Sequence, residues 1–249
     1  MKTFRFIGMA LFAFLMCVNL SSCSSSDDDP TEEPEEGGGV VSGKKIAKII
    51  SELEDWKETR TFAYDDKGRL IKSTEIDEHD NEKNTRTYQY IWGDDAIKCT
   101  GDNNYTFTLK NGLVQSDERH TYSYNKSNRL VKVETDYSTT TAIWDGDKLM
   151  SISYEDDEET KTFTYEKSCK KGFFPFAANM IDDCELFIAH PEIAGSLTTQ
   201  LPASITETSK NHGSEKAILT YEFDKDGYIS KILIKATDGS TETYTLTWQ

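Results

Sequence analysis

Apolar and polar residues alternate along most of the chain between Lys44 and Gln249. A period of two is typical of antiparallel strands with one packed face and one solvated face. The polar positions are mostly Thr, Ser, Gln, Glu and Lys, and the spacing predicts an all-β meander of about sixteen strands. The alternating apolar sets are Tyr88, Tyr90 and Trp92; Tyr105, Phe107 and Leu109; Met150, Ile152 and Tyr154; Phe163 and Tyr165; Leu219, Tyr221 and Phe223; Tyr244, Leu246 and Trp248.

A recurring hairpin underlies this pattern. It occupies residues 62–70, 122–130 and 221–229, with looser copies at 109–113 and 144–149. In the three closer copies, aromatic residues end a strand, Asp or Asn opens the turn, and an aliphatic residue starts the next strand. Gly68, Asn128 and Gly227 occupy equivalent places, where we expect a positive φ because Gly and Asn tolerate it best.

A sheet of this size must curl, close into a barrel or be covered, because a flat one would expose its aromatic face. The alternation stops over residues 168–204, and a helix is predicted there over residues 175–189. Its apolar stripe predicts a plug packed on the concave face of the sheet. The alternative is a lid over a ligand cavity. The stripe consists of Phe176, Met180, Cys184, Phe187 and Ile188.

The N-terminal segment looks like a bacterial lipoprotein signal. Lys2 and Arg5 precede an apolar run, and Leu20 is followed by two serines and Cys23. This predicts cleavage before Cys23 and a lipid such as palmitate on that residue, although an ordinary signal peptide remains an alternative. The resulting organisation is a signal peptide over residues 1–22, a flexible acidic leash over 23–43 and a single β-rich domain over 44–249.

The residues after Cys23 resemble the acidic export signal of Bacteroidota surface lipoproteins. The matching residues are Ser26, Asp27, Asp28 and Asp29. The resemblance implies a lipid-anchored protein of the outer membrane that faces the cell exterior. The alternative interpretation is that these aspartates belong only to a solvated leash.

The net charge limits the classes of partner, and the cysteines limit the possible disulfides and metal sites. The chain carries 28 Lys and Arg against 44 Asp and Glu, so its net charge of −16 disfavours nucleic acid as a partner. In an oxidising compartment, Cys169 and Cys184 are the favoured disulfide pair and Cys99 is left over. The cysteines and histidines have no zinc-binding spacing, so no metal or cofactor is predicted.

Motifs for enzymatic chemistry are missing from the sequence. It contains no nucleophile elbow, zinc-protease helix, phosphate loop or dinucleotide fingerprint. Residues 222–233 superficially match a calcium loop, but Leu233 stands where the closing carboxylate is needed. Residues 156–159 form an acidic turn, and the four tryptophans fit a core as well as a sugar platform. We predict no enzyme activity, with a carboxylate-dependent hydrolase as one alternative.

Two resemblances bear on function. Residues 62–72 and 122–132 are similar to the YD repeats of Rhs-type bacterial surface and toxin-shell proteins, which implies a shell or scaffold. The whole chain resembles an uncharacterised family of Bacteroidota lipoproteins, from which no functional residue can be transferred. We therefore expect a non-enzymatic surface lipoprotein that binds a glycan, a lipid or an envelope protein. The second hypothesis is a carrier of hydrophobic ligands with residues 175–189 as its lid.

Overall fold

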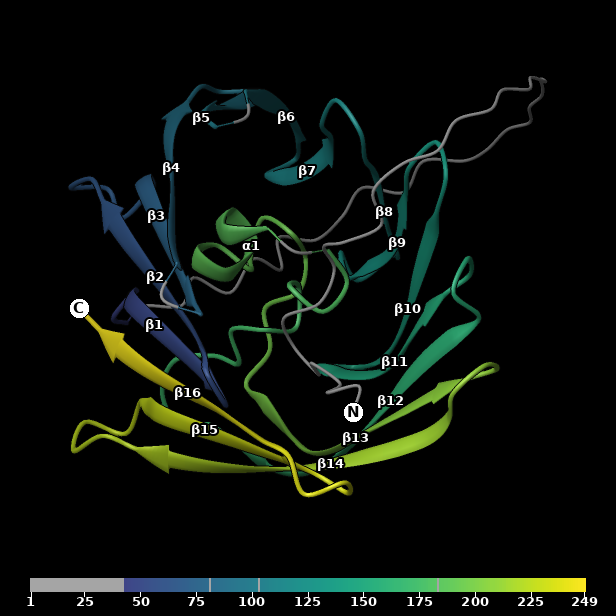
Figure 1. The fold of residues 1–249 in the computed structure, drawn as a ribbon. Coiled ribbons are helices and arrows are strands. Elements are labelled where there is room, and N and C mark those ends of the chain that lie inside the picture. Colours follow the sequence, from purple (N-terminus) through teal and green to yellow (C-terminus); the bar gives the residue numbers. More distant parts are fainter. Residues whose placement is uncertain (1–42, 81, 103, 183) are drawn as a thin grey trace, which may run out of the picture.

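Sixteen antiparallel strands form a closed barrel in the computed structural model, which describes residues 43–80, 82–102, 104–182 and 184–249 (Figure 1). The strands are β1 (Ile46–Leu53), β2 (Trp56–Tyr64), β3 (Leu70–His79), β4 (Glu82–Trp92), β5 (Ala96–Gly101), β6 (Tyr105–Lys110), β7 (Leu113–Ser116), β8 (Thr121–Tyr124), β9 (Leu130–Glu134), β10 (Thr139–Asp145), β11 (Lys148–Tyr154), β12 (Glu159–Ser168), β13 (Gln200–Ser209), β14 (Gly213–Phe223), β15 (Ile229–Ala236) and β16 (Thr241–Trp248). Each strand pairs with its neighbours in sequence, and β1 pairs with β16 to complete the ring. The predicted meander of sixteen strands is confirmed.

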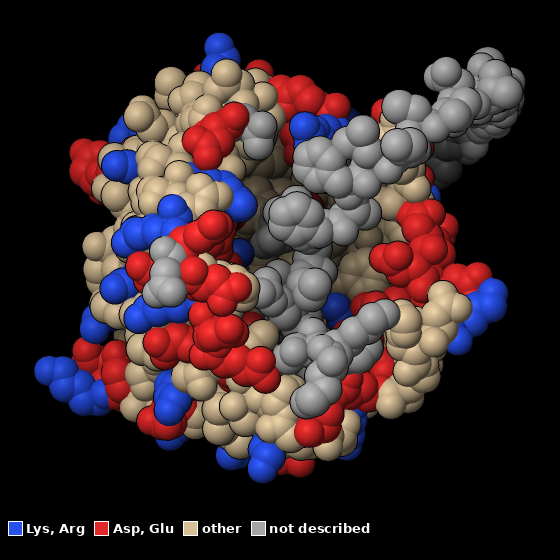
Figure 2. Space-filling view, viewed as in Figure 1, with Lys and Arg blue, Asp and Glu red and all other residues tan. Residues whose placement is uncertain are grey.

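The two faces of the barrel wall differ in polarity as the period of two predicts. On β16, Tyr244, Leu246 and Trp248 point inward and are at most 8% exposed. The positions between them point outward and are threonines. The same arrangement recurs on β2, β4 and β12, and Figure 2 shows acidic and basic side chains spread over the visible face. The outward threonines of these four strands are Thr59, Thr61, Thr85, Thr87, Thr160, Thr162, Thr164, Thr241, Thr243, Thr245 and Thr247.

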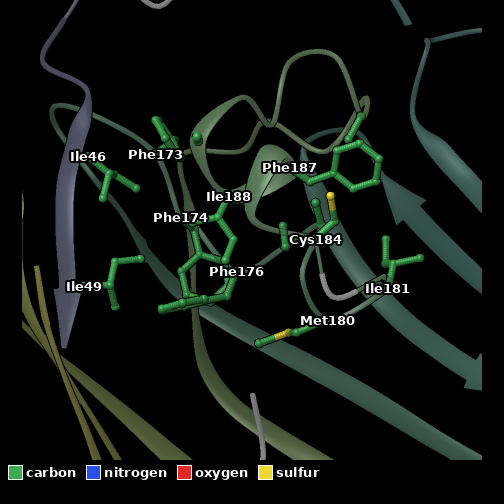
Figure 3. Packing of buried hydrophobic residues seen from close by; sticks show 14 of the residues in the cluster. Ile46, Ile49, Phe173, Phe174, Phe176, Met180, Ile181, Cys184, Phe187 and Ile188 are labelled. Atoms are coloured by element: carbon green, nitrogen blue, oxygen red, sulfur yellow. The ribbon is translucent and has the colours of Figure 1, made fainter. Parts of the chain in front are cut away.

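The interior of the barrel is filled by residues 169–199, which connect β12 to β13 and which we call the interior segment (Figures 1 and 3). Most of its aromatic and aliphatic side chains are buried and join the inward side chains of the strands in one core. The predicted plug is therefore confirmed. The buried residues include Phe173, Phe174, Phe176, Met180, Ile181, Phe187 and Ile188.

The helix inside the barrel is shorter than predicted. Only α1 (Glu185–Ala189) is helical, whereas residues 175–181 form successive turns with mixed hydrogen bonds. These turns bury side chains on every side, including Phe176, Ala178 and Ile181, so the backbone follows the shape of the enclosed space. Tertiary packing here overrides the helical periodicity. With five residues, α1 is too short to cross a bilayer, and no longer apolar helix occurs in the described residues.

The three equivalent turns are confirmed. The carboxylate of Asp65 accepts hydrogen bonds from the backbone N–H groups of Lys67 and Arg69 at 3.0 and 2.9 Å, and Asn125 and Asp224 bind their own turns in the same way. The left-handed residue has φ of +73° at Gly68, +57° at Asn128 and +90° at Gly227. Each side chain that opens a turn thus satisfies two backbone donors.

A tryptophan on the second strand after each turn completes the unit. The indoles of Trp92, Trp144 and Trp248 donate to the carbonyls of Leu70, Leu130 and Ile229 at 2.7, 2.7 and 2.6 Å. Each acceptor residue lies beside a β-bulge, where the ladder is interrupted. These indoles face the core and satisfy backbone acceptors, so they do not form an exposed sugar platform.

Candidate functional site

Charged side chains enter the lumen at one end of the barrel. This end carries the turns that follow the odd-numbered strands, and we call it the mouth. The interior segment enters from the opposite end, where the three equivalent turns lie. Buried charged residues are rare unless they are paired, so their concentration makes the mouth the candidate functional site. Those at most 8% exposed are Glu58, Arg60, Glu75, Lys161, Glu207 and Glu242.

Two arginines organise the part of the mouth formed by β2, β3 and β4. Arg60 lies against Glu58, and its Nε is 3.9 Å from Oε2 of Glu75. From the next strand, Arg86 reaches Oε1 of Glu75 at 2.7 Å and Asp77 at 3.7 Å. These side chains all point inward because they occupy alternate positions on neighbouring strands.

Glu185, the first residue of α1, hydrogen-bonds Glu75 from inside the barrel. Burial raises the pKa of Glu75 to about 8, and the hydrogen bond and negative charge of Glu185 act in the same direction. The pair therefore holds a proton near neutral pH. Two carboxyl groups in direct contact leave no room for a sugar ring, since glycosidases keep theirs about 5 Å or more apart.

A second polar corner lies at the turn between β7 and β8. Asp117 accepts hydrogen bonds from Nδ1 and the backbone N–H of His120, at 3.0 and 2.7 Å. Tyr122 donates its hydroxyl to Asp182 of the interior segment at 2.7 Å and lies 3.2 Å from Asp117. The hydrogen bond that the His120 ring donates to the Asp117 carboxylate raises the pKa of His120. His120 therefore favours its charged form beside two carboxylates.

The third corner is centred on a buried lysine. Lys161 Nζ lies 3.4 Å from Glu159 and 3.6 Å from Glu207, and 5.1 Å from the centre of the Tyr154 ring. Burial raises the pKa of Glu207. Each corner joins side chains from different strands, or from a strand, a turn and the interior segment, so strand patterning predicts which strand residues point inward but not which side chains meet.

Comparisons with known proteins identify the fold. No family model matches the chain, and no curated protein matches it. The chain shares its fold with porin-like proteins of Bacteroides. A porin-like protein from Bacteroides uniformis ATCC 8492 superposes with a TM-score of 0.66 at 17% identity, over 83% of this chain and 98% of that one. Another from Bacteroides vulgatus ATCC 8482 gives 0.59 at 14% identity, over 83% and 99%. The resemblance to YD repeats stays an expectation.

The lumen around these charges is tightly filled. A cavity of about 10 Å³, the space of about one water molecule, lies between β1, β2, β16 and the interior segment. Its lining includes Ser51, Arg60, Asn179 and Tyr244. The burial of Phe176, Phe187 and Ile188 in the common core favours the plug over the lid of a hollow carrier.

A larger groove of 270 Å³ lies outside the core, between the β11–β12 and β13–β14 turns. The predicted acidic turn forms one side of it, and Glu158 of that turn pairs with Lys210 at 2.6 Å. The groove is thus a charged, solvated surface. Its lining residues are Asp156, Asp157, Glu158, Glu159, Ser209, Asn211 and His212.

One group of potential metal ligands was missed by sequence reasoning. Ligand atoms of Asp55, His79 and Asp80 lie within 4.8 Å of one another, and all three residues are exposed. They come from the β1–β2 turn and from the end of β3 with the turn after it. Spacing along the chain could not reveal this group, because Asp55 and His79 meet only through strand pairing.

The predicted attachment and disulfide residues have different outcomes. Cys23, Ser26, Asp27, Asp28 and Asp29 lie outside the described residues. Cys169 and Cys184 are free, buried thiols, so the structure lacks the disulfide expected between them. The thiol of Cys169 instead points to the carbonyls of Gly172 and Thr199 at 3.5 and 3.3 Å, whereas Cys184 precedes α1. Sequence separation suggested the pair, and the disulfide stays a prediction.

Proposed function

We propose that the protein is a non-enzymatic surface lipoprotein of the outer membrane whose barrel acts as a binding or scaffold module and not as a pore. The observation that carries this proposal is the polarity of the barrel wall, which is apolar inside and polar outside. Similarity to proteins described as porin-like supplies the fold and the connection to the outer membrane. The distribution of polar and apolar side chains on that fold distinguishes the proposed module from a pore.

A membrane-spanning barrel needs an outward apolar band about 25 Å tall and a polar interior. In this chain the outward positions of β16 are threonines, and β2, β4 and β12 also carry threonines at outward positions. Among the described residues, the large apolar side chains exposed on strands are Ile71 on β3, Ile91 on β4, Ile143 on β10, and Ile218 and Phe223 on β14. Burying this wall in lipid would strip water from many polar groups without compensation.

The predicted lipid on Cys23 would attach such a barrel to the membrane. The twenty residues from Ser24 to Gly43 are rich in Ser, Asp, Glu, Pro and Gly, and a flexible chain of that length spans about 25 Å on average. The barrel would then stand in water beside the membrane, with the mouth free to meet an envelope protein or a glycan. Resemblance to YD repeats supports a scaffold role.

Fractionation of cells tests the anchor. The wild-type chain should sediment with the outer membrane, and Cys23→Ala should release it into the soluble fraction with its barrel folded. Protease treatment of intact cells should remove the wild-type barrel if it faces outward. A Cys23→Ala protein that stays bound to the membrane would contradict the lipid anchor.

Conductance across planar bilayers tests the distinction from a pore. The purified full chain should give no channel steps, because its lumen is filled by side chains and its wall is polar. Defined channel steps from purified protein would overturn the proposal, whatever the result for the anchor. Binding arrays of envelope glycans and pull-downs with the folded chain then test the binding role.

A further inference from the structure

The interior segment carries acidic side chains to places on the wall that already hold acidic side chains. Glu185 meets Glu75 on β3, and Asp182 shares the hydroxyl of Tyr122 with Asp117. Like charges at such distances repel unless a proton or a cation lies between them. Both contacts lie at the mouth and hold neighbouring parts of the same segment.

We infer that α1 and Asp182 form a proton-dependent latch that holds the interior segment against the mouth, and that loss of the bound protons releases it. This inference goes beyond the proposed function, because it concerns a movement inside the barrel and not its attachment or partner. Below, the latch means α1 and Asp182 with their partners Glu75, Asp117 and His120.

Glu75 has charged neighbours on every side. Arg60 approaches from β2 at 3.9 Å, and Arg86 approaches from β4 at 2.7 Å. Both arginines favour the charged form of Glu75, but each is shared with another carboxylate, Glu58 or Asp77, and burial together with Glu185 outweighs them. One proton between the two glutamates removes their repulsion, and its loss would leave two negative charges in contact.

Besides Glu75, three uncharged groups interact with Glu185. They are Tyr88 and Tyr90 on β4 and Cys99 on β5, and each of these has a pKa raised first by burial. Neutral at ordinary pH, they cannot take the place of the shared proton. The attachment of Glu185 to β3 therefore depends on protonation of the pair.

A rise in pH should also weaken the second contact of the latch, in which Tyr122 binds Asp182. His120 lies against Asp117 at 3.0 Å, Tyr122 bridges towards Asp182, and Arg119 is the nearby cation on the same turn. When His120 loses its proton, the two carboxylates lose their closest positive charge. A rise in pH thus weakens both contacts of the latch, and a fall in pH strengthens both.

The wall is also weakest beside this contact. β7 and β8 share a single paired position, Ser116 with Thr121. The interior segment supports this seam from within, because the N–H of Val114 donates to the carbonyl of Ile193 at 2.9 Å. Release of the latch would therefore loosen the mouth where the ladder is shortest, and would expose the Cys184 side chain, now 8% accessible (Figure 3).

Hydrogen exchange of the full-length chain in detergent tests the latch. After correction for the intrinsic pH dependence of exchange, peptides covering α1 should exchange about tenfold faster at pH 9 than at pH 6, because released protons drive the opening. Peptides from β14 to β16 should stay protected at both pH values and so report that the barrel remains folded.

Two substitutions identify the responsible proton. Glu75→Gln keeps a neutral hydrogen-bonding group at all pH values, so α1 should stay protected at pH 9. Glu78→Gln is the matched control, because it removes a carboxylate from the outward face of the same strand and should behave as wild type. Glu185→Gln places the neutral amide on the other partner and should repeat the effect if Glu75→Gln fails to fold. Exchange of α1 that is independent of pH in the wild type, or equal in Glu75→Gln and wild type at pH 9, would overturn the inference.

Discussion

At Gly195 the backbone of the interior segment lies directly against the wall. It has a φ of +60°, and a Cβ built on it would lie 2.2 Å from the carbonyl oxygen of Asn128 and 3.0 Å from the Tyr124 ring. Its own carbonyl accepts a hydrogen bond from the N–H of Leu130 at 3.3 Å. An alanine there would have to move the backbone away from the second of the three equivalent turns.

The cost of Gly195→Ala can be worked out from these contacts. A left-handed alanine costs about 1–2 kcal/mol, overpacking against the Asn128 carbonyl about 1–3 kcal/mol and the weakened hydrogen bond about 1 kcal/mol. The free energy of unfolding should therefore fall by about 3–6 kcal/mol. Gly112→Ala is the control, since Gly112 has a φ of +75° with no atom within 4 Å of a Cβ, and should lose only about 1–2 kcal/mol.

Denaturation with guanidinium, followed by tryptophan fluorescence, measures both variants. The difference between them isolates the steric term, because both residues have the same handedness. If Gly195→Ala unfolds at the same guanidinium concentration as Gly112→Ala, then the close approach to Asn128 does not contribute to stability and the account of the interior segment is wrong.

Four further results are expected. Phe187→Ala should lower the free energy of unfolding by about 3–5 kcal/mol in guanidinium titrations, because the ring is fully buried in the interior segment. Asp65→Ala should lower the guanidinium midpoint because two backbone N–H groups lose their acceptor, whereas Asp65→Asn should lower it less because it keeps the acceptor that Asn125 provides in the second turn. His120→Asn should lower the free energy of unfolding at pH 5.5, and the difference in this free energy between variant and wild type should shrink towards pH 9. Folding raises the pKa of His120 above its ordinary value of about 6.5. The stability that His120 contributes is therefore complete below about 6.5 and is lost as pH rises through the folded-state pKa. Cys169 and Cys184 should both be alkylated in denaturant without a reductant, as mass spectrometry would show.

The alternation of apolar and polar residues predicted the strands because successive side chains of a barrel strand face the core and the solvent in turn. The three turns were equally predictable, since Asp65 and Gly68 act locally within five residues. The interior segment was predicted only as a whole. Its apolar stripe indicated burial, but enclosure on all sides removed the need for a regular helix, and residues 175–181 became turns.

The charged mouth could not be predicted from the sequence, although each of its residues lies on a predicted strand or in the predicted insertion. Glu75 and Glu185 are separated by nine strands along the chain, and only closure of the sheet around the interior segment brings them together. The same holds for Tyr122 and Asp182. Barrel closure itself depends on pairing between Ile46 and Trp248, which no local pattern specifies.

Joining the first strand to the last sets an order of events during folding. Because the interior segment lies between β12 and β13, we expect it to pack inside the sheet before β1 pairs with β16. Contacts between such distant residues form late and slowly. Until then the nascent protein presents two open edges and an uncovered aromatic surface, both of which invite self-association. Losing the final strand alone should consequently yield aggregates and not a smaller barrel.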